Sequence, residues 1–329
     1  MTLPELDVLK PGTLADALRL LRENPDARPI AGGTDLLVLM KQRLVNPKTL
    51  IDVSRLSELQ DIAEQDDSLR IGAAVLLTEI TGNDRINRDY PGLAEAARFV
   101  ASPNLRNMGT IGGNICLTPR CSYFNQSQFW RDSLGRCLKT GGDVCFAVPG
   151  ARRCYASFCA DCPPVLIALG ATVTIVRWKK GGVTERRGSL ENLYRDDGVK
   201  PLSLGRDELV TAVHLPLKGK GYRSAYLKYR RRASIDFPLA GVAVAFGLEE
   251  GKFKNIRIVL NALASSPILA GESMARLEGE PYNERVVEDA MTCLARGAHP
   301  VRNQAGSPEH RRRMAGILFR RAVGRLINV

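Results

Sequence analysis

The spacing of apolar residues in the first hundred positions predicts short helices and strands in mixed order. A helix is expected from residue 14, because apolar side chains recur there with helical spacing after Thr13, a good N-cap, and Asp16 follows three residues later. Residues 30–41 run from a short apolar stretch through two glycines into a second apolar run. The pattern further predicts strands at 49–54 and 69–75 and a helix at 92–101.

Longer apolar runs follow in the second half of the chain. Residues 163–178 predict a helix followed by a strand, and residues 208–217 predict another strand. A new unit begins near residue 218, with antiparallel strands over 222–263 that are joined at Glu250-Gly251. Helices are predicted at about 282–296 and at 308–327, the latter capped by Ser307 with Pro308 in its first position.

Residues 116–160 match neither the helical nor the strand period and are interpreted as a loop insert. They are rich in Cys, Arg, Gly and aromatic residues. A loop of this length inside a compact domain needs a source of order other than an apolar core.

Composition restricts the class of protein only moderately. The chain has 329 residues, of which 44% are hydrophobic and 25% charged, which is ordinary for a globular protein. We expect a cytoplasmic protein without a membrane segment, because the N-terminus lacks a signal-peptide pattern and the longest apolar run is too short to span a bilayer. The net charge of +12 is spread over many short clusters without interleaved aromatics, which disfavours nucleic acid and favours a solvated surface or an acidic redox partner.

The cysteines are the most unusual feature of the sequence. Seven of the eight lie within residues 116–162, and Cys293 has the helical spacing of a core residue. In a reducing compartment such a cluster indicates metal or redox chemistry rather than disulfides. Zinc is disfavoured because there is one tight cysteine pair and no nearby histidine. Iron–sulfur ligation tolerates more varied spacing.

Two cysteine quartets satisfy an iron–sulfur cluster, and spacing does not decide between them. The first consists of Cys121, Cys137, Cys145 and Cys154. The second combines Cys154, Cys159 and Cys162, whose spacing is similar to the plant-type ferredoxin pattern, with one upstream cysteine.

Two glycine turns, "AGGTDLL" (31–37) and "TIGGNI" (110–115), are candidates for a phosphate site. Glycine allows backbone N–H groups to approach a phosphate closely, and the hydroxyls of Thr34 and Thr110 can add donors. Neither turn is a dinucleotide fingerprint or a P-loop. Either could be a purely structural turn, but the pair favours a diphosphate held between two lobes.

Taken together, the motifs resemble the flavin-binding subunit of the molybdenum hydroxylases, the xanthine dehydrogenase and carbon monoxide dehydrogenase group. The resemblance covers nearly the whole chain. It rests on "AGGTDLLVLMK" (31–41), "LRIGAAVLLTEI" (69–80), "RNMGTIGGNI" (106–115), "DCPPVLIALGA" (161–171), "ELVTAVHLP" (208–216) and "YLKYRRRASIDFPLAGVAVA" (226–245). It implies an α+β fold: a two-lobed FAD-binding domain of the xanthine dehydrogenase/vanillyl-alcohol-oxidase type, with lobes at 1–57 and 58–217, and a C-terminal antiparallel-sheet-and-helix domain at 218–329.

The resemblance also implies the contacts to FAD. The diphosphate turn and the second turn supply most of them, with Asp161 on the ribose or adenine side and Val210 and Lys228 opposite. Asp161 could instead cap the following helix, Lys228 could be an exposed strand lysine, and Asp236 is expected to fix a turn. The implied cofactor-binding residues are Ala31, Gly32, Gly33, Thr34, Asp35, Leu36, Thr110, Gly113, Asn114, Asp161, Val210 and Lys228.

One branch of this family, the beta subunit of 4-hydroxybenzoyl-CoA reductase, has a similar cysteine-rich insert, including "RCSYFNQSQFWR" (120–131), "CLKTGGDVC" (137–145) and "RCYASF" (153–158). The likeness implies a 4Fe–4S cluster on Cys121, Cys137, Cys145 and Cys154. Cys116, Cys159 and Cys162 then have no assigned role. The neighbouring cations Arg120, Arg136, Lys139, Arg152 and Arg153 would raise the potential of the cluster or attract an acidic ferredoxin, unless they form a plain solvated face.

The implied function is electron transfer between a ferredoxin-like donor and two partner chains, one with molybdopterin and one with 2Fe–2S clusters, in a dimer of heterotrimers. The complex would reductively dehydroxylate 4-hydroxybenzoyl-CoA, and no catalytic residue is expected in this chain. Another aromatic acyl-CoA or a heterocycle is the alternative substrate within this class. A zinc-stabilised, basic nucleic-acid-binding protein and a stand-alone flavin oxidase are the alternatives from outside it.

Overall fold

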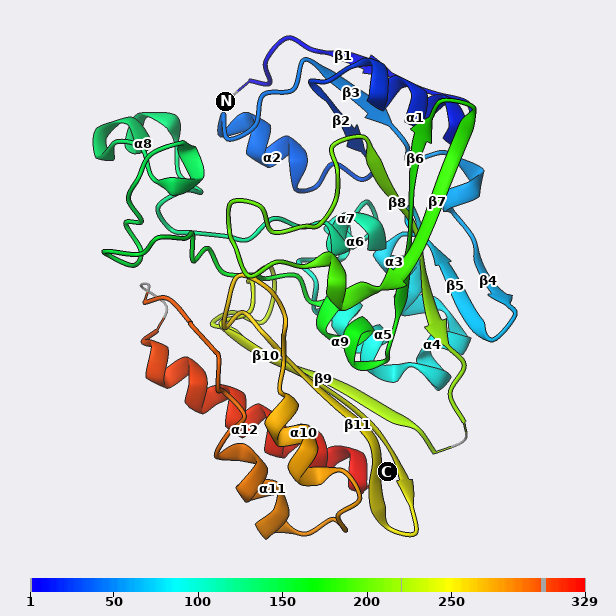
Figure 1. Cartoon of the computed structure of the whole chain (residues 1–329), viewed down its shortest axis with the longest axis vertical. Coiled ribbons are helices and arrows are strands. Elements are labelled where there is room, and N and C mark those ends of the chain that lie inside the picture. The colour runs from blue at the N-terminus through cyan, green and yellow to red at the C-terminus, as the bar shows by residue number, and fades with distance from the viewer. Residues whose placement is uncertain (1, 220, 303–305, 329) are drawn as a thin grey trace.

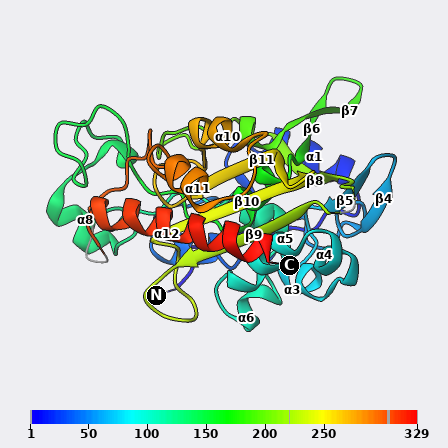
Figure 2. The same ribbon diagram turned by 90° about the horizontal axis from the view of Figure 1, so that it is seen from below.

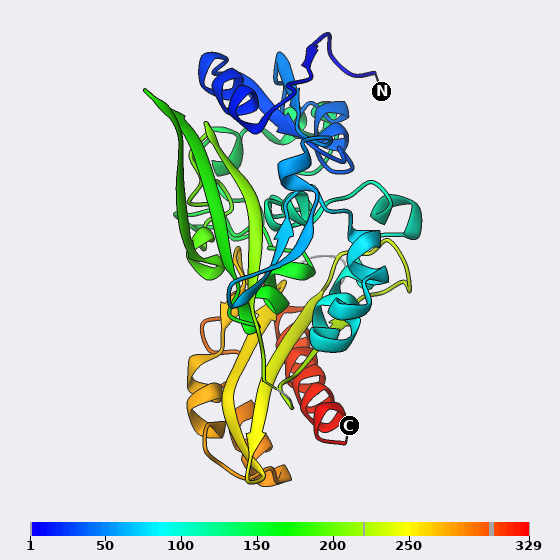
Figure 3. The ribbon, with the colours of Figure 1, turned by 90° about the vertical axis from the view of Figure 1, so that its right-hand side faces the viewer.

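The computed structural model describes residues 2–219, 221–302 and 306–328. Three β-sheets follow one another along the long axis of the molecule, with the N-terminal sheet at one end and the C-terminal helices at the other (Figures 1 and 3). The cysteine-rich insert projects from the side of the middle layer (Figure 1). Within the described ranges, no helix is both long and apolar enough to cross a membrane.

The N-terminal sheet is small and parallel, and helix α1 covers it. Its order is β1 (Asp7–Leu9), β3 (Thr49–Asp52) and β2 (Ala27–Ile30). Helix α1 (Leu14–Glu23) begins as predicted, because the Thr13 hydroxyl accepts the N–H of Asp16. Its apolar face packs with Val176 and Leu209 of the middle sheet, so this first lobe is held against the second. Helix α2 (Leu36–Lys41) follows the first glycine turn.

The middle sheet is antiparallel and carries helices on one face. Its order is β4 (Ile62–Gln65), β5 (Ser68–Gly72), β8 (Glu208–Pro216), β6 (Thr172–Lys179) and β7 (Gly182–Ser189). The associated helices are α3 (Leu77–Gly82), α4 (Asp84–Asp89), α5 (Pro91–Phe99), α6 (Pro103–Arg106), α7 (Ile111–Ile115) and α9 (Cys162–Ala168), with short 3-10 turns at Ser57–Leu59 and Leu190–Leu193. Sheet and helices share one buried core.

The C-terminal sheet separates two cores. Its order is β12 (Ile268–Leu269), β11 (Lys252–Asn261), β10 (Ala240–Glu249) and β9 (Arg223–Tyr229), all antiparallel. In β10, Ala243 and Ala245 face the core of the middle layer, whereas Val242 and Val244 face α10 (Gly271–Leu277), α11 (Glu284–Met291) and α12 (Pro308–Ile327). Figure 2 shows α12 lying along this sheet. The hairpin turns at Glu250-Gly251, as predicted.

The structure corrects four element predictions. Strand β7 was not foreseen, because it is an exposed edge strand with a single apolar side chain, Val183. Helix α10 was missed, and α11 ends several residues before the predicted 296. The insert, predicted to lack helix, contains α8 (Gln128–Leu134) and a 3-10 turn at Leu138–Thr140. None of the residues of α8 is buried, so it shows no apolar periodicity.

His214 on β8 is a pH-sensitive point in this framework. Its Nε2 lies 2.8 Å from the Thr174 hydroxyl, while its buried Nδ1 has no partner among the described residues. Burial, reinforced by the nearby Arg187 and Arg70 guanidinium groups, lowers the pKa of His214 to about 4. The folded state therefore favours the neutral imidazole, and this stabilisation is present above pH 6.5 and is lost as the pH falls towards 4.

We predict that the free energy of unfolding falls by about 2 kcal/mol between pH 6.5 and pH 4 through His214. Urea unfolding across this range measures it, and His214→Gln should flatten the pH dependence. His310→Gln is the control, since His310 is exposed. An unchanged pH profile in His214→Gln would contradict the assignment.

Candidate functional site

A cavity of about 580 Å³ lies between the two lobes of the N-terminal part and the loop between β9 and β10. This size is typical of a site for an organic cofactor. Both glycine turns, the segment before α9 and the start of β8 contribute to its wall. The wall contains eleven of the twelve residues predicted to bind the cofactor: Ala31, Gly32, Gly33, Thr34, Asp35, Leu36, Thr110, Gly113, Asn114, Asp161 and Val210.

The first glycine turn presents backbone donors to the cavity. It connects β2 to α2, and Gly33 takes a positive φ of 67° that favours glycine. The N–H groups of Gly32, Gly33 and Thr34 have no acceptor in the part of the chain that the structure describes. Free, consecutive N–H groups beside a cavity are suited to bind phosphate oxygens.

The second turn is held by its own cap. The Thr110 hydroxyl accepts the N–H of Gly113 at 3.1 Å, so this donor is already used in starting α7. The Asn114 carboxamide oxygen accepts the N–H of Cys162 at 3.2 Å and joins α7 to the start of α9. The second turn therefore forms part of the cavity wall, but unlike the first turn it does not present a row of free N–H groups.

The two turns touch each other, and glycine is needed at the contact. A Cβ at Gly32 would lie 1.8 Å from the carbonyl oxygen of Met108. A Cβ at Gly112 would lie 2.7 Å from the carbonyl oxygen of Ala73. A side chain at Gly32 would push the two lobes apart where they enclose the cavity, whereas a side chain at Gly112 would disturb the packing within the second lobe.

Asp161 and Lys228 form a buried ion pair behind the cavity wall. Lys228 Nζ lies 2.8 Å from Asp161 Oδ2 and also donates to the carbonyl oxygen of Phe99 at 3.0 Å, while the Tyr226 hydroxyl donates to Asp161 Oδ1 at 2.8 Å. Burial raises the pKa of Asp161, and the Lys228 ammonium and the Tyr226 hydroxyl counteract this by stabilising the carboxylate.

This geometry corrects two interpretations. Asp161 makes no capping hydrogen bond to α9, and the Lys228 side chain is 1% exposed rather than on the surface. Lys228 is also the one predicted cofactor contact that does not line the cavity. Asp236 does fix a turn, since it accepts the N–H of Arg232 at 2.8 Å, and it lines the cavity as well.

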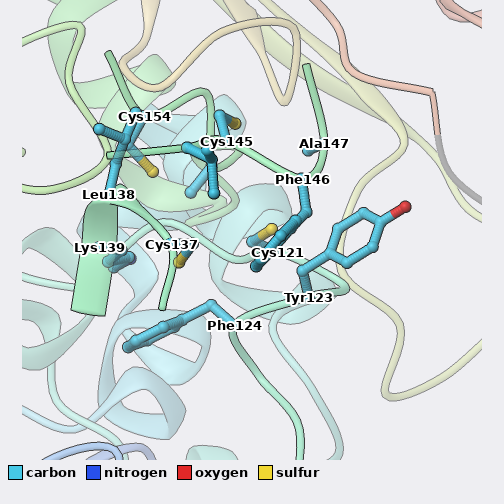
Figure 4. A pocket seen from close by; sticks show the side chains of 12 residues that line it. Cys121, Tyr123, Phe124, Cys137, Leu138, Lys139, Cys145, Phe146, Ala147 and Cys154 are labelled. Atoms are coloured by element: carbon cyan, nitrogen blue, oxygen red, sulfur yellow. The ribbon is translucent and has the colours of Figure 1, made fainter. Parts of the chain in front are cut away.

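A second, smaller cavity lies inside the insert. Its wall contains Cys121, Cys137, Cys145 and Cys154, together with aromatic and aliphatic residues and one lysine, Lys139. Figure 4 shows the four cysteines arranged around this space. The structure thus brings together the first of the two quartets considered from the sequence.

The alternative quartet is not assembled. Cys159 lines the large cavity instead, and Cys162 is fully buried in the core beneath it. Cys116 also lines the large cavity. Burial raises the pKa of Cys116 to about 12 and that of Cys159 to about 11, so both thiols are protonated at neutral pH. Cys293 is buried, as predicted, and its Sγ donates to the carbonyl oxygen of Ala290.

The small cavity has the donor chemistry of an iron–sulfur site. Its wall contains no His, Asp or Glu. Burial raises the pKa of Cys121 and Cys154, and the backbone N–H groups of Tyr123 and Phe124 near Cys121 and of Ala156 near Cys154 offset this rise only in part. In the described ranges, no three Cys, His, Asp or Glu side chains are placed to share one metal ion.

Arg120 connects the two cavities, which the sequence did not reveal. Its guanidinium pairs with Asp35 of the first glycine turn and stacks over the ring of Phe237 at 5.3 Å. Both Asp35 and Phe237 line the large cavity. Arg120 directly precedes Cys121, and its backbone pairs with Ser157. In the sequence, Arg120 was recognisable only as one of several cations near the cysteines.

Comparison with known proteins identifies the family. Residues 4–218 match the family described as FAD binding domain in molybdopterin dehydrogenase, and residues 224–326 match the CO dehydrogenase flavoprotein C-terminal domain. The carbon monoxide dehydrogenase medium chain of Afipia carboxidovorans is 28% identical over 97% of this chain and 96% of its own. A putative xanthine dehydrogenase FAD-binding subunit of Escherichia coli K12 is 26% identical over 96% of this chain and 94% of its own.

Solved structures agree with this assignment. A chain of the reconstituted CO dehydrogenase from Oligotropha carboxidovorans superposes with a TM-score of 0.81 at 28% identity, covering 99% of both chains. The chain belongs to the family of FAD-binding subunits of the xanthine dehydrogenase and CO dehydrogenase type. The family match replaces the alternative of a zinc-stabilised nucleic-acid-binding protein. The predicted bounds at 57 and 217 and the roles of single residues stay predictions.

We predict that Gly32→Ala lowers the affinity for FAD at least about tenfold, or about 1.4 kcal/mol. The new Cβ would collide with the Met108 carbonyl and separate the two turns. Fluorescence titration with FAD measures the effect. Gly12→Ala is the matched control, because a Cβ at Gly12 meets nothing within 4 Å. Equal affinity in the two variants would show that the contact is not needed.

We predict that Lys228→Met destabilises the protein by about 3–5 kcal/mol, because it leaves the Asp161 carboxylate buried without its counter-ion. Urea unfolding checks this. Lys254→Met serves as control and should cost less than about 1 kcal/mol, since its ion pair with Glu249 is exposed. A loss in Lys228→Met no larger than that of the control would contradict the structural role of the pair.

Proposed function

We propose that the chain is the electron-transfer subunit of a molybdenum-containing complex, with FAD in the large cavity and a 4Fe–4S cluster on Cys121, Cys137, Cys145 and Cys154. The observation that carries the proposal is that all four cysteines line one cavity without any other ligating side chain. Most residues that line the large cavity belong to the segment 4–218, which matches a family described as an FAD-binding domain.

The residues present suit both groups. The free N–H groups of Gly32, Gly33 and Thr34 would hold the diphosphate of FAD, and the cavity between the lobes would enclose the rest. Thr110, Gly113, Asn114, Asp161 and Val210 would form the remaining wall. When bound, the flavin exchanges one or two electrons and the cluster exchanges one, so the pair converts between single electrons and electron pairs.

The short link between the cavities supports a relay. The chain runs from Cys154 to Asp161 in seven residues and so passes from one cavity wall to the other. Arg120 forms a second link, through its pairing with Asp35. We propose that this chain accepts low-potential electrons from a ferredoxin-like donor at the insert and passes them towards the flavin.

The proposed partners are a large chain with molybdopterin and a small chain with 2Fe–2S clusters, arranged as a dimer of heterotrimers in the cytoplasm. Relatives support a multi-subunit setting, since several are named as medium chains or as one subunit of a complex. The proposed reaction of the complex is the reductive dehydroxylation of 4-hydroxybenzoyl-CoA. It is supported by the similarity of the insert to that branch, and no catalytic residue is assigned to this chain.

The names of relatives point to other substrates. Carbon monoxide, xanthine, nicotine and caffeine appear in their names. Another aromatic acyl-CoA or a heterocycle therefore remains the alternative. The complex, purified anaerobically, should reduce 4-hydroxybenzoyl-CoA with a reduced viologen as donor. Oxidation of a heterocycle with an added electron acceptor, with no dehydroxylation of 4-hydroxybenzoyl-CoA, would replace this substrate and leave the electron-transfer role intact.

We predict that the isolated holoprotein contains FAD and about four irons per chain, and that Cys137→Ser loses most of this iron. Iron and sulfide analysis with the visible spectrum measures both. Cys159→Ser is the matched control and should keep its iron, because Cys159 lies outside the small cavity. FAD without iron in the unaltered protein, or zinc in place of iron, would overturn the cluster.

A further inference from the structure

The structure distinguishes among the five cations near the cysteines. Arg136 and Arg152 are exposed to solvent. Arg153 pairs with Asp196 and stacks over the Tyr155 ring at 4.4 Å, and Arg120 pairs with Asp35. The charges of Arg153 and Arg120 are therefore compensated by carboxylates. The charges of Arg136 and Arg152 are screened by water. Lys139 is the remaining member of the group.

Lys139 is the one charged residue in the wall of the small cavity. Its ammonium donates to the carbonyl oxygen of Pro119 at 2.9 Å and lies 4.6 Å from the centre of the Phe124 ring. These contacts come from the residues on both sides of Arg120-Cys121 and fix the ammonium beside the cysteines (Figure 4). No carboxylate lies within ion-pair distance of Lys139 among the described residues.

A partly buried cation without a counter-ion costs free energy. A carbonyl dipole and an aromatic face reduce this cost but carry no net negative charge. The other potential charge carriers in the wall of this cavity are the four cysteine thiols. Four thiolates on an iron–sulfur cluster give the group a net negative charge, and this would supply the missing counter-ion.

We propose that Lys139 is the charge partner of the cluster and sets its reduction potential. The proposal rests on the proposed function, because it needs the cluster in the small cavity. Adding one electron makes the cluster more negative, so a fixed ammonium in its wall stabilises the reduced form over the oxidised form. Lys139 is thus a positioning and tuning residue, distinct from the four ligands, and it raises the potential of the cluster towards that of an incoming low-potential donor.

The decisive measurement is a redox titration of the anaerobic holocomplex, followed by electron paramagnetic resonance of the reduced cluster, with dithionite as the reductant. In Lys139→Met, the ratio of reduced to oxidised cluster at a fixed ambient potential should fall at least about tenfold, which is about 59 mV for a one-electron couple. Lys139→Arg keeps the charge and should shift much less. Arg152→Met is the matched control and should not shift, because its charge is in solvent.

Lys139→Gln separates charge from packing, because its amide can still donate to Pro119. A lowered potential in Lys139→Gln supports the proposal, even if Lys139→Met loses its iron. Loss of iron in both Lys139→Met and Lys139→Gln, with full iron in Lys139→Arg, also supports the proposal, because the positive charge at this position is then what the cluster requires. An unchanged potential in an iron-replete Lys139→Met or Lys139→Gln, or equal loss of iron in all three variants, overturns it. Absence of iron from the unaltered protein is a different result, and refutes the cluster itself.

Discussion

The buried contact between Lys228, Asp161 and Tyr226 holds together the parts that enclose the large cavity. Lys228 and Tyr226 belong to the C-terminal sheet, Asp161 to the segment before α9, and the Phe99 carbonyl to the end of α5. An ion pair with both side chains almost completely buried is stabilising only when its hydrogen bonds are satisfied, and each of these atoms has its partner. The cavity wall therefore depends on a strand that lies outside the two flavin-binding lobes.

The C-terminal domain of this chain therefore contributes to the wall of the large cavity. The Tyr226 side chain of β9 packs into the core of the middle layer. Its hydroxyl, which donates to Asp161, also accepts a hydrogen bond from the Asn261 side chain of β11 at 2.8 Å. The loop after β9 then adds Ile235, Asp236 and Phe237 to the cavity wall. The loop between β9 and β10 is thus part of the site, and the C-terminal sheet supports the wall through Lys228 and Tyr226.

The sequence predicted those features that local chemistry determines. Caps, hairpin turns and apolar spacing located most elements, and the two glycine turns do meet at one cavity. Strand β7 and helix α8 escaped because both are exposed and stabilised by neighbours rather than by an apolar stripe. The partners of Lys228 and Arg120 could not be derived either, because Asp161 and Asp35 are distant in sequence and only the folded chain places them together. Resemblance named Lys228 as a cofactor contact, which stays a prediction; in the structure Lys228 pairs with Asp161 behind the cavity wall.

The insert presents a different physical problem, because it has almost no core of its own. Tyr123, Trp130 and Phe146 form a small aromatic group in which no side chain is fully buried, and Phe129 is 86% exposed. Burial of apolar area on this scale cannot offset the chain entropy of some forty residues. Bonds from four thiolates to one cluster would supply that free energy and would couple the order of the insert to metal loading. The same bonds would place a negative group beside Lys139 and, through Arg120, next to the turn that faces the flavin cavity. On this view one feature of the sequence, the spacing of four cysteines, accounts for the folding of the insert, its charge balance and its position against the flavin site.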